Sequence, residues 1–293
     1  MSETKKDIEE VTVKIDCRAP AAIADNLSRT ICVHKVNASI FKLTILGILA
    51  GVYIGFGACL ITVVGYDAVN YVGVGLSRLI CGAVFSLGLM LVVIAGAELF
   101  TGNNLMLMSV LDKKSSLWKM LFKWCVVYAA NFAGAIFLAY LFFNTGLWKM
   151  GDNGVGVNAL KLANFRMNLT FTEALTRGIL CNWLVCLAVW MALASRDVVG
   201  KIFSCFFPIM AFIACGFEHC VANMYFIPFG IFLKSSGQIV PQGIDLTSLT
   251  WHNFFLKNLI PVSIGNIIGG AIFVGLLYWM VYVKGVENKQ IQQ

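Results

Sequence analysis

Long apolar stretches separated by shorter polar connections dominate the sequence. Six such stretches lie at roughly residues 40–65, 77–111, 117–143, 171–194, 202–233 and 254–283. A helix of about 20 apolar residues crosses the hydrocarbon core of a bilayer, so each stretch is long enough to span a membrane. The pattern predicts an all-α integral membrane protein with a six-helix domain at 39–283, a polar N-terminal segment at 1–38 and a short tail at 284–293.

Two of these stretches are too long for one plain helix, and each has a polar interruption in its second half. The second stretch contains GAELFTGNN at 96–104, and the fifth contains GFEHCVAN at 216–223. Where a helix breaks within lipid, its freed backbone groups must be satisfied inside the protein or in a water-filled cavity. We therefore predict that the second and fifth helices are broken and that their breaks lie along a transport pathway.

The two interruptions share a pattern. Gly-x-Glu-x-x-x-x-Asn occurs at 96–103 and again at 216–223, and the helices that follow share Asn-x-x-Gly at 131–134 and at 266–269. The chain is therefore interpreted as a three-helix unit used twice. Because three is an odd number, the second unit must be inverted in the membrane relative to the first, as in transporters whose broken helices meet near the midplane.

Composition and charge agree with a membrane protein and give its orientation. Hydrophobic residues make up 59% of the chain, charged residues 13%, and the mean hydropathy is +0.81, whereas soluble domains are roughly 45–50% apolar. The net charge of +7 lies largely in short connections such as 112–123 and 195–201, while 66–77 has no basic residue. By the positive-inside rule both termini face the cytoplasm, in a plasma or inner membrane. This charge distribution does not indicate nucleic-acid binding.

The ten cysteines do not indicate a redox or metal site. Most of them lie in the apolar stretches, and no Cys-x-x-Cys pair occurs. We interpret them as small hydrophobic residues and expect neither a metal nor a cofactor.

His219 is the ionisable residue of the second interruption that has no counterpart in the first. A histidine at membrane depth is by default a functional residue. Apolar surroundings favour the neutral imidazole, whereas a negative charge nearby favours imidazolium. We therefore expect His219 to attract an anion and to supply it with a proton. Asn182 and Thr101 could donate to the same anion or orient the imidazole, and either could equally bind a backbone carbonyl.

The other polar residues of the interruptions have counterparts, which favours a structural role. Glu98 and Glu218 are expected to accept hydrogen bonds from the backbone amides freed at the breaks, as carboxylates do at helix N-termini. Asn103 and Asn223 belong to the same framework.

Three motifs resemble signature stretches of the formate/nitrite transporter family: AELFTGNN at 97–104, GILCNWLVCLAVWMA at 178–192 and GFEHCVANMYFIP at 216–228. The resemblance covers about residues 35–283. It implies an aquaporin-like protomer with its own pore, assembled as a homopentamer in the lipid bilayer. The substrates that it implies are small monovalent anions or their acids, namely formate, nitrite, hydrosulfide, acetate or lactate, moved together with protons.

The resemblance also assigns site residues. The central histidine of the family matches His219, its asparagine matches Asn182 and its loop threonine matches Thr101. Arg166 stands where the family has a vestibule lysine, so the positive charge is kept with a different geometry. The apolar constrictions match Phe85, Leu89, Leu99, Phe100, Val185 and Phe212. An anion concentrated at the vestibule would cross these constrictions as its neutral acid, because a bare charge is costly to desolvate.

Two other classes of protein were weighed. A channel for neutral small solutes would share an inverted repeat with half-helices, but it would show paired Asn-Pro-Ala triplets, and the breaks of this sequence contain no proline. A membrane enzyme would need a nucleophile, a metal cluster or paired carboxylates, and none is visible apart from the two separated glutamates.

Overall fold

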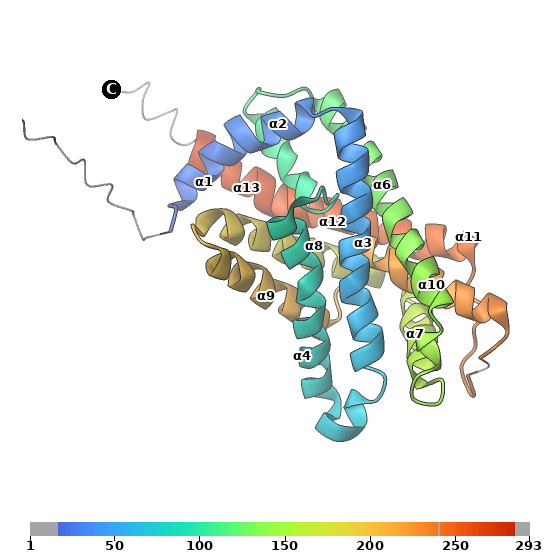
Figure 1. The fold of residues 1–293 in the computed structure, drawn as a ribbon. Helices are drawn as coiled ribbons and strands as arrows, with labels where there is room; N and C mark the ends of the chain where they lie inside the picture. The colour runs from blue at the N-terminus through green and yellow to red at the C-terminus, as the bar shows by residue number, and fades with distance from the viewer. Residues whose placement is uncertain (1–16, 240, 285–293) are drawn as a thin grey trace, which may run out of the picture.

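The computed structural model describes residues 17–239 and 241–284. Within these residues, six helices are long and apolar enough to cross a membrane, as predicted. In Figure 1 some of them run from top to bottom and others run across these at an angle. Their bounds are Ile40–Val64, Ala68–Gly96, Leu117–Asn144, Phe171–Ala194, Val198–Cys215 and Trp251–Lys284.

The first three spans and the segments between them form the first half of the chain. The elements are α3 (Ile40–Val64), α4 (Ala68–Met90), the π-helical η2 (Leu91–Gly96), the short η3 (Gly102–Met106), α5 (Leu107–Leu111) and α6 (Leu117–Asn144). Helix α3 packs directly on α6, and two of its glycines allow this. A Cβ on Gly51 would clash with the backbone of Asn131, and one on Gly47 would clash with Ala130.

The second half of the chain repeats this order. Its elements are α8 (Phe171–Ala194), α9 (Val198–Cys215), α10 (Cys220–Ser236) and a last span built from α11 (Trp251–Asn253), η5 (Phe254–Leu259), α12 (Ile260–Ile267), η6 (Ile268–Leu276), α13 (Leu277–Trp279) and η7 (Met280–Lys284). Helix α8 begins with a capping box, in which Thr170 and Glu173 bind each other's backbone amides. Asp197 caps α9 by accepting the backbone N–H of Gly200 with its side chain.

Both predicted breaks are present, and glycine makes each of them. The backbone leaves η2 at Gly96 with a φ of +90° and leaves α9 at Gly216 with a φ of +78°. These are left-handed conformations that a residue with a Cβ rarely adopts. The non-helical segments that follow are short, and His219 is the N-cap residue of α10.

A short helix outside the six predicted stretches lies beside α10. The connection after α6 contains a short turn, η4 (Leu147–Lys149), and then helix α7 (Gly154–Met167). Helix α7 packs against α10, where Gly230 leaves room for Ala163. Nearly every residue of α10 is buried, so α7 completes the cover of a half-helix that lies in the interior.

The described part of the N-terminal segment is helical. It contains α1 (Pro20–Asn26), the π-helical η1 (Leu27–Ile31) and α2 (Cys32–Asn37). Arg18 donates from its backbone and its guanidinium to the last carbonyls of α8, at Ala194 and Leu193. Helix α1 also contacts η7, so both ends of the described chain meet at one end of the bundle (Figure 1). The rest of the predicted terminal segments, 1–16 and 285–293, lies outside the described residues.

Candidate functional site

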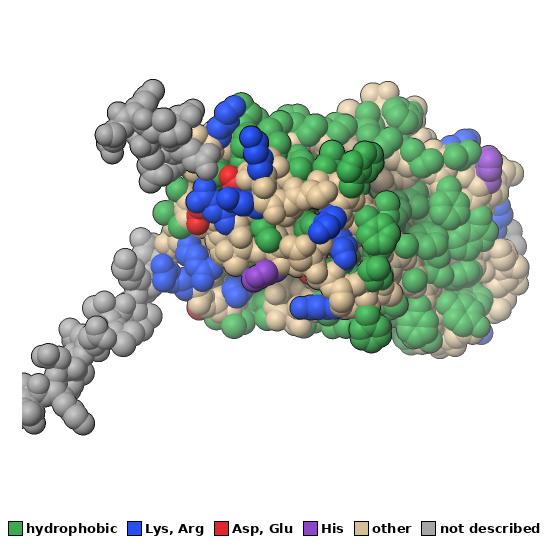
Figure 2. Space-filling view, turned by 90° about the horizontal axis from the view of Figure 1, so that it is seen from above, with side chains coloured by type: hydrophobic (Ala, Val, Ile, Leu, Met, Phe, Trp, Pro, Cys, Tyr) green, Lys and Arg blue, Asp and Glu red, His purple; other side chains and the backbone are tan. Residues whose placement is uncertain are grey.

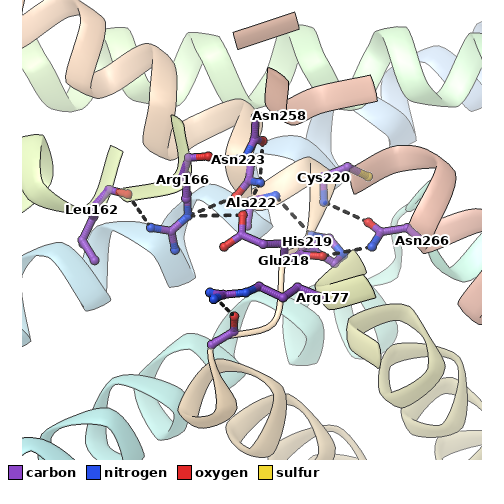
Figure 3. Close-up of polar contacts among 11 residues, drawn as sticks. Leu162, Arg166, Arg177, Glu218, His219, Cys220, Ala222, Asn223, Asn258 and Asn266 are labelled. Carbon is purple, nitrogen blue, oxygen red and sulfur yellow. Dashed lines mark hydrogen bonds and ion pairs between the residues drawn. The ribbon is translucent and has the colours of Figure 1, made fainter. Parts of the chain in front are cut away.

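The two breaks meet at a contact between His219 and Thr101. The imidazole Nε2 of His219 lies 3.0 Å from Thr101 Oγ1, and both side chains are buried. On the other side of the ring, Nδ1 accepts the backbone N–H of Ala222 at 3.1 Å, which caps α10 (Figure 3). Because Nδ1 is an acceptor, the proton of the neutral imidazole lies on Nε2 and is donated to Thr101. The helix cap therefore fixes the tautomer.

Thr101 is held in place by its carbonyl oxygen. Asn182 Nδ2 lies 3.2 Å from this oxygen, 2.8 Å from Asn104 Oδ1 and 2.7 Å from the carbonyl oxygen of Asn266. Cys186 Sγ donates to the same Thr101 carbonyl at 3.4 Å. Of the two alternatives left open for Asn182, the structure therefore has the backbone contact. Asn182 Oδ1 and Asn104 Nδ2 are buried without a hydrogen-bond partner among the described residues.

Aromatic rings flank the histidine. Phe212 stacks on the His219 ring with centroids 6.0 Å apart, and Phe85 meets Phe212 edge-on at 5.7 Å. All six residues expected at the constrictions are buried, and Phe85 and Phe212 are the two that lie on the His219 side. Phe100 packs against Trp124 and Tyr128 of α6 instead.

A cavity opens beside each break. The first-break cavity measures about 430 Å³, and its lining includes Leu89, Leu99, Lys35, Lys42 and Glu98. The second-break cavity measures about 240 Å³, and its lining includes Arg78, Asn158, Arg166, Phe217 and Glu218. His219 belongs to neither lining. Each break thus has a cavity on one side and the contact between His219 and Thr101 on the other.

Asn131 of α6 makes three hydrogen bonds at the first break. Asn131 Nδ2 donates to the carbonyl oxygens of Gly47 at 2.8 Å and Glu98 at 2.9 Å. Its Oδ1 accepts the N–H of Phe100 at 2.8 Å. A single amide side chain thus ties the break to α3 and α6.

The second break has the same arrangement. Asn266 Nδ2 donates to the carbonyl oxygens of Gly178 at 2.8 Å and Glu218 at 3.0 Å, and its Oδ1 accepts the N–H of Cys220 at 2.9 Å (Figure 3). These matched contacts support the interpretation of two equivalent three-helix units. Glu98 and Glu218 are expected to accept hydrogen bonds from the freed backbone amides; among the described residues, the hydrogen bonds to their carboxylates come from side chains.

The carboxylates bind basic and amide side chains instead. Glu98 Oε2 accepts from Lys35 Nζ at 2.8 Å, and Lys35 also donates to Asn103 Oδ1 at 2.9 Å. In the second break, Glu218 Oε2 accepts from Asn223 Nδ2 at 2.7 Å, and Asn223 Oδ1 accepts from Arg166 Nε at 3.1 Å. Lys35 and Arg166 are thus equivalent, and the sequence reading missed Lys35. The spacing could have identified Lys35, because Lys35 precedes α3 by the same number of residues as Arg166 precedes α8.

Arg166 lines the second-break cavity, as expected of a vestibule residue, and two of its five N–H donors are used within the protein. Besides Asn223, it donates from Nη1 to the carbonyl oxygen of Leu162 at 2.7 Å, and its Nε lies 3.9 Å from Glu218 Oε2 (Figure 3). The guanidinium also lies over the Phe226 ring, 4.2 Å from the centroid. Asn258 fixes the Arg166 carbonyl at 3.0 Å. Arg166 is therefore held firmly in the wall of the cavity.

Comparisons with known proteins agree with one another. The family model described as "Formate/nitrite transporter" matches residues 21–280. The chain is 44% identical over 283 residues to the probable formate transporter of Methanothermobacter thermautotrophicus, covering 91% of this chain and 98% of that protein. It is 35% identical over 275 residues to the formate channel FocA of Escherichia coli (strain K12), covering 92% and 96% respectively.

Solved structures give the same result for the fold. A pentameric formate channel with formate bound superposes with a TM-score of 0.74 at 36% identity, covering 83% of this chain and 98% of that one. An ion channel of the FNT family superposes with a TM-score of 0.72 at 29% identity, covering 89% of this chain and 97% of that one.

Proposed function

The chain belongs to the formate/nitrite transporter family, and on that premise we propose that it moves formate and related small monovalent anions across a membrane as their neutral acids. It is a multi-pass membrane protein that serves transport rather than catalysis, since its relatives are formate channels and transporters. Nitrite, hydrosulfide, acetate and lactate belong to the same proposal because each is a small monovalent anion of a weak acid.

The contact between His219 and Thr101 is the observation that carries the proposal. It joins the two breaks at a buried point flanked by Phe85 and Phe212. A bare anion would lose most of its hydration among these apolar rings, which is costly. An oxygen of the substrate can replace Thr101 Oγ1 as the acceptor of the His219 Nε2–H bond. His219 is thus a neutral hydrogen-bond donor that holds the substrate in the narrowest region.

The proton that neutralises the substrate comes from water in the cavities. Imidazolium would need a proton on Nδ1 as well, and Nδ1 is occupied by the Ala222 N–H. Protonating His219 would therefore sacrifice the cap of α10. Low dielectric disfavours the charged form of the substrate, so its own affinity for a proton rises as it leaves the cavity. Asn182 acts in this scheme by positioning Thr101 through its carbonyl oxygen.

Assembly and orientation follow the relatives and the charge distribution. We infer a homopentamer, because a solved relative is described as a pentameric formate channel. We place both termini in the cytoplasm and the protein in the plasma or inner membrane. Figure 2 shows the end of the bundle where α1 and α2 lie, and Lys and Arg side chains gather there, which supports this orientation under the positive-inside rule.

A flux assay in proteoliposomes tests the proposed function. The purified wild type and His219→Phe are compared with formate, nitrite, hydrosulfide, acetate and lactate across a series of pH values. We expect wild-type flux to rise as the pH falls, because more of the substrate is protonated. His219→Phe keeps an aromatic ring in place but removes the Nε2–H donor, so we expect a loss of about tenfold in flux, which corresponds to one hydrogen bond between neutral groups.

Two outcomes would contradict the proposal. Voltage-driven current that does not depend on pH would indicate an open anion channel rather than passage of the neutral acid. If the wild type moves none of the five substrates, the inference about substrate class fails.

A further inference from the structure

The charges in the second-break cavity do not all cancel. Its lining contains three charged residues: Arg78, Arg166 and Glu218. Arg166 and Glu218 lie 3.9 Å apart, with side chains 12% and 3% exposed. At this distance, and so far from bulk water, their opposite charges largely offset each other. The net positive charge of the cavity is therefore that of Arg78.

Arg78 differs from Arg166 in how many of its donors are free. It lies on α4 and is exposed, and among the residues that the structure describes it makes no hydrogen bond and no ion pair. A guanidinium has five N–H donors in a planar fork that matches the two oxygens of a carboxylate. Arg166 already uses two of its five donors on Asn223 and Leu162, whereas among the described residues all five donors of Arg78 are available.

The guanidinium of Arg78 lies at the break itself. A Cβ built on Gly216 would lie 2.5 Å from Arg78 Nη2. The glycine that begins the break therefore also leaves room for this guanidinium. Arg177 approaches the same point from α8, where its Nη1 donates to the Gly216 carbonyl at 3.5 Å (Figure 3). Arg177 thus binds the backbone and does not line the cavity, whereas Arg78 does, together with Arg166.

We propose that Arg78 is the anion-binding residue of the second-break cavity, where it holds a small monovalent carboxylate in two parallel N–H to oxygen bonds. Arg166 forms the wall behind it and keeps Glu218 neutralised, so that this carboxylate does not repel the arriving anion. The cavity, at about 240 Å³, is large enough for formate and several water molecules. This inference rests on the proposed function, because it names the residue that receives that substrate.

The first-break cavity shows the same division of roles. Its Lys35 is paired with Glu98, while Lys42 also lines the cavity and is exposed. Among the described residues, the ammonium group of Lys42 makes no hydrogen bond and no ion pair. Each cavity therefore combines one basic residue tied to the glutamate of the break with one that has free donors. This arrangement supports the proposal independently of Gly216.

Formate flux into proteoliposomes provides the test, with Arg78→Gln and Arg78→Lys compared with the wild type at several formate concentrations and two ionic strengths. We expect Arg78→Gln to raise the KM by about tenfold, since a single charge at a cavity mouth raises the local anion concentration by that order. The kcat should stay near the wild-type value, because Arg78 lines the cavity and His219 does not. Arg78→Lys should keep the dependence of the KM on salt but restore only part of the affinity, because an ammonium group has the charge without the two-donor fork. The KM of Arg78→Gln should lose its dependence on salt.

Lys161→Gln is the matched control. Lys161 is exposed on α7, near Arg166 in the chain, but it does not line the cavity. Removing its charge should leave the KM unchanged. Arg78→Met, which keeps an unbranched apolar stem, is the second variant if Arg78→Gln does not fold, as judged by gel filtration in detergent.

The result that overturns the proposal is a wild-type KM in a folded Arg78→Gln or Arg78→Met protein. A fall in kcat with unchanged KM would also overturn it, because that result would indicate a structural role. If the wild type itself transports none of the anions, the proposed function is what fails, so the two failures are distinguishable.

Discussion

At the scale of single residues, the partners of each polar atom decide its chemistry. His219 presents Nε2–H to the centre of the protein because Nδ1 is used to cap α10. Arg166 has the charge of a vestibule residue, but two of its donors are bound to Asn223 and Leu162 and its charge is offset by Glu218. Charge alone therefore does not identify the residue that meets the substrate. The residue that meets the substrate is identified by its unused hydrogen-bond donors, and this criterion indicates Arg78.

A structural role of Arg166 predicts a large effect on stability. Arg166→Leu would leave the Glu218 carboxylate, 3% exposed, without its positive neighbour. Removing one partner of a buried pair costs about 3–5 kcal/mol, so we expect a clear fall in the thermal unfolding midpoint in detergent. Lys35→Leu should cost less, because Lys35 and Glu98 are 30% and 12% exposed and water can solvate the remaining carboxylate. An unchanged midpoint for Arg166→Leu, with reduced transport, would instead make Arg166 the anion-binding residue.

At the scale of elements, the two broken helices are stabilised by residues of other helices. Asn131 of α6 and Asn266 of α12 each bind two carbonyl oxygens and one N–H around a break. Within the membrane no other solvent would satisfy these groups. Each break is therefore stable only when the third helix of its unit is packed in place.

The matched contacts predict matched effects of mutation. Asn131→Ala and Asn266→Ala should each destabilise the protein by about 1–3 kcal/mol or more, the cost of leaving buried polar groups without partners. Asn144→Ala is the control, since Asn144 is exposed and bonds only one carbonyl within α6, that of Tyr140. The thermal unfolding midpoint in detergent provides the measurement. A large effect at one asparagine and none at the other would contradict the equivalence of the two units.

At the scale of the whole molecule, the spans differ in how much of their surface the protein itself covers. In α4 with η2 and in α9, only 33% and 22% of the apolar window is buried, against 56% in α3. Large apolar side chains such as Phe203 and Phe207 are exposed on α9. Lipid or further copies of the chain must cover these surfaces.

The proposed homopentamer predicts the size of the particle. Native mass spectrometry from mild detergent should give five times the mass of the 32.1 kDa chain. Chemical cross-linking should produce a ladder that ends at the fifth band. A purified monomer that still transports formate would contradict the need for the pentamer.

Much of the fold could be read from the sequence because it depends on local properties. Apolar length determined the spans, which the structure confirms within one to several residues at most boundaries. The helices break at Gly96 and Gly216, where the backbone has a positive φ. This position can be read from the sequence because glycine tolerates that conformation without a steric cost. The shared spacing of the two interruptions indicated the repeat. Helix α7 was missed because a short helix of mixed polarity has no clear local signal.

Only the tertiary structure decided which polar groups pair. The contacts between Lys35 and Glu98, between Thr101 and His219, and between Arg166 and Asn223 join segments far apart in the chain. The sequence marked His219 and the two glutamates as polar groups that needed partners in an apolar setting. It could not supply those partners, because hydrogen bonds and ion pairs depend on atomic distances that long-range packing creates. For the same reason, only the fold separates the bound guanidinium of Arg166 from the free one of Arg78.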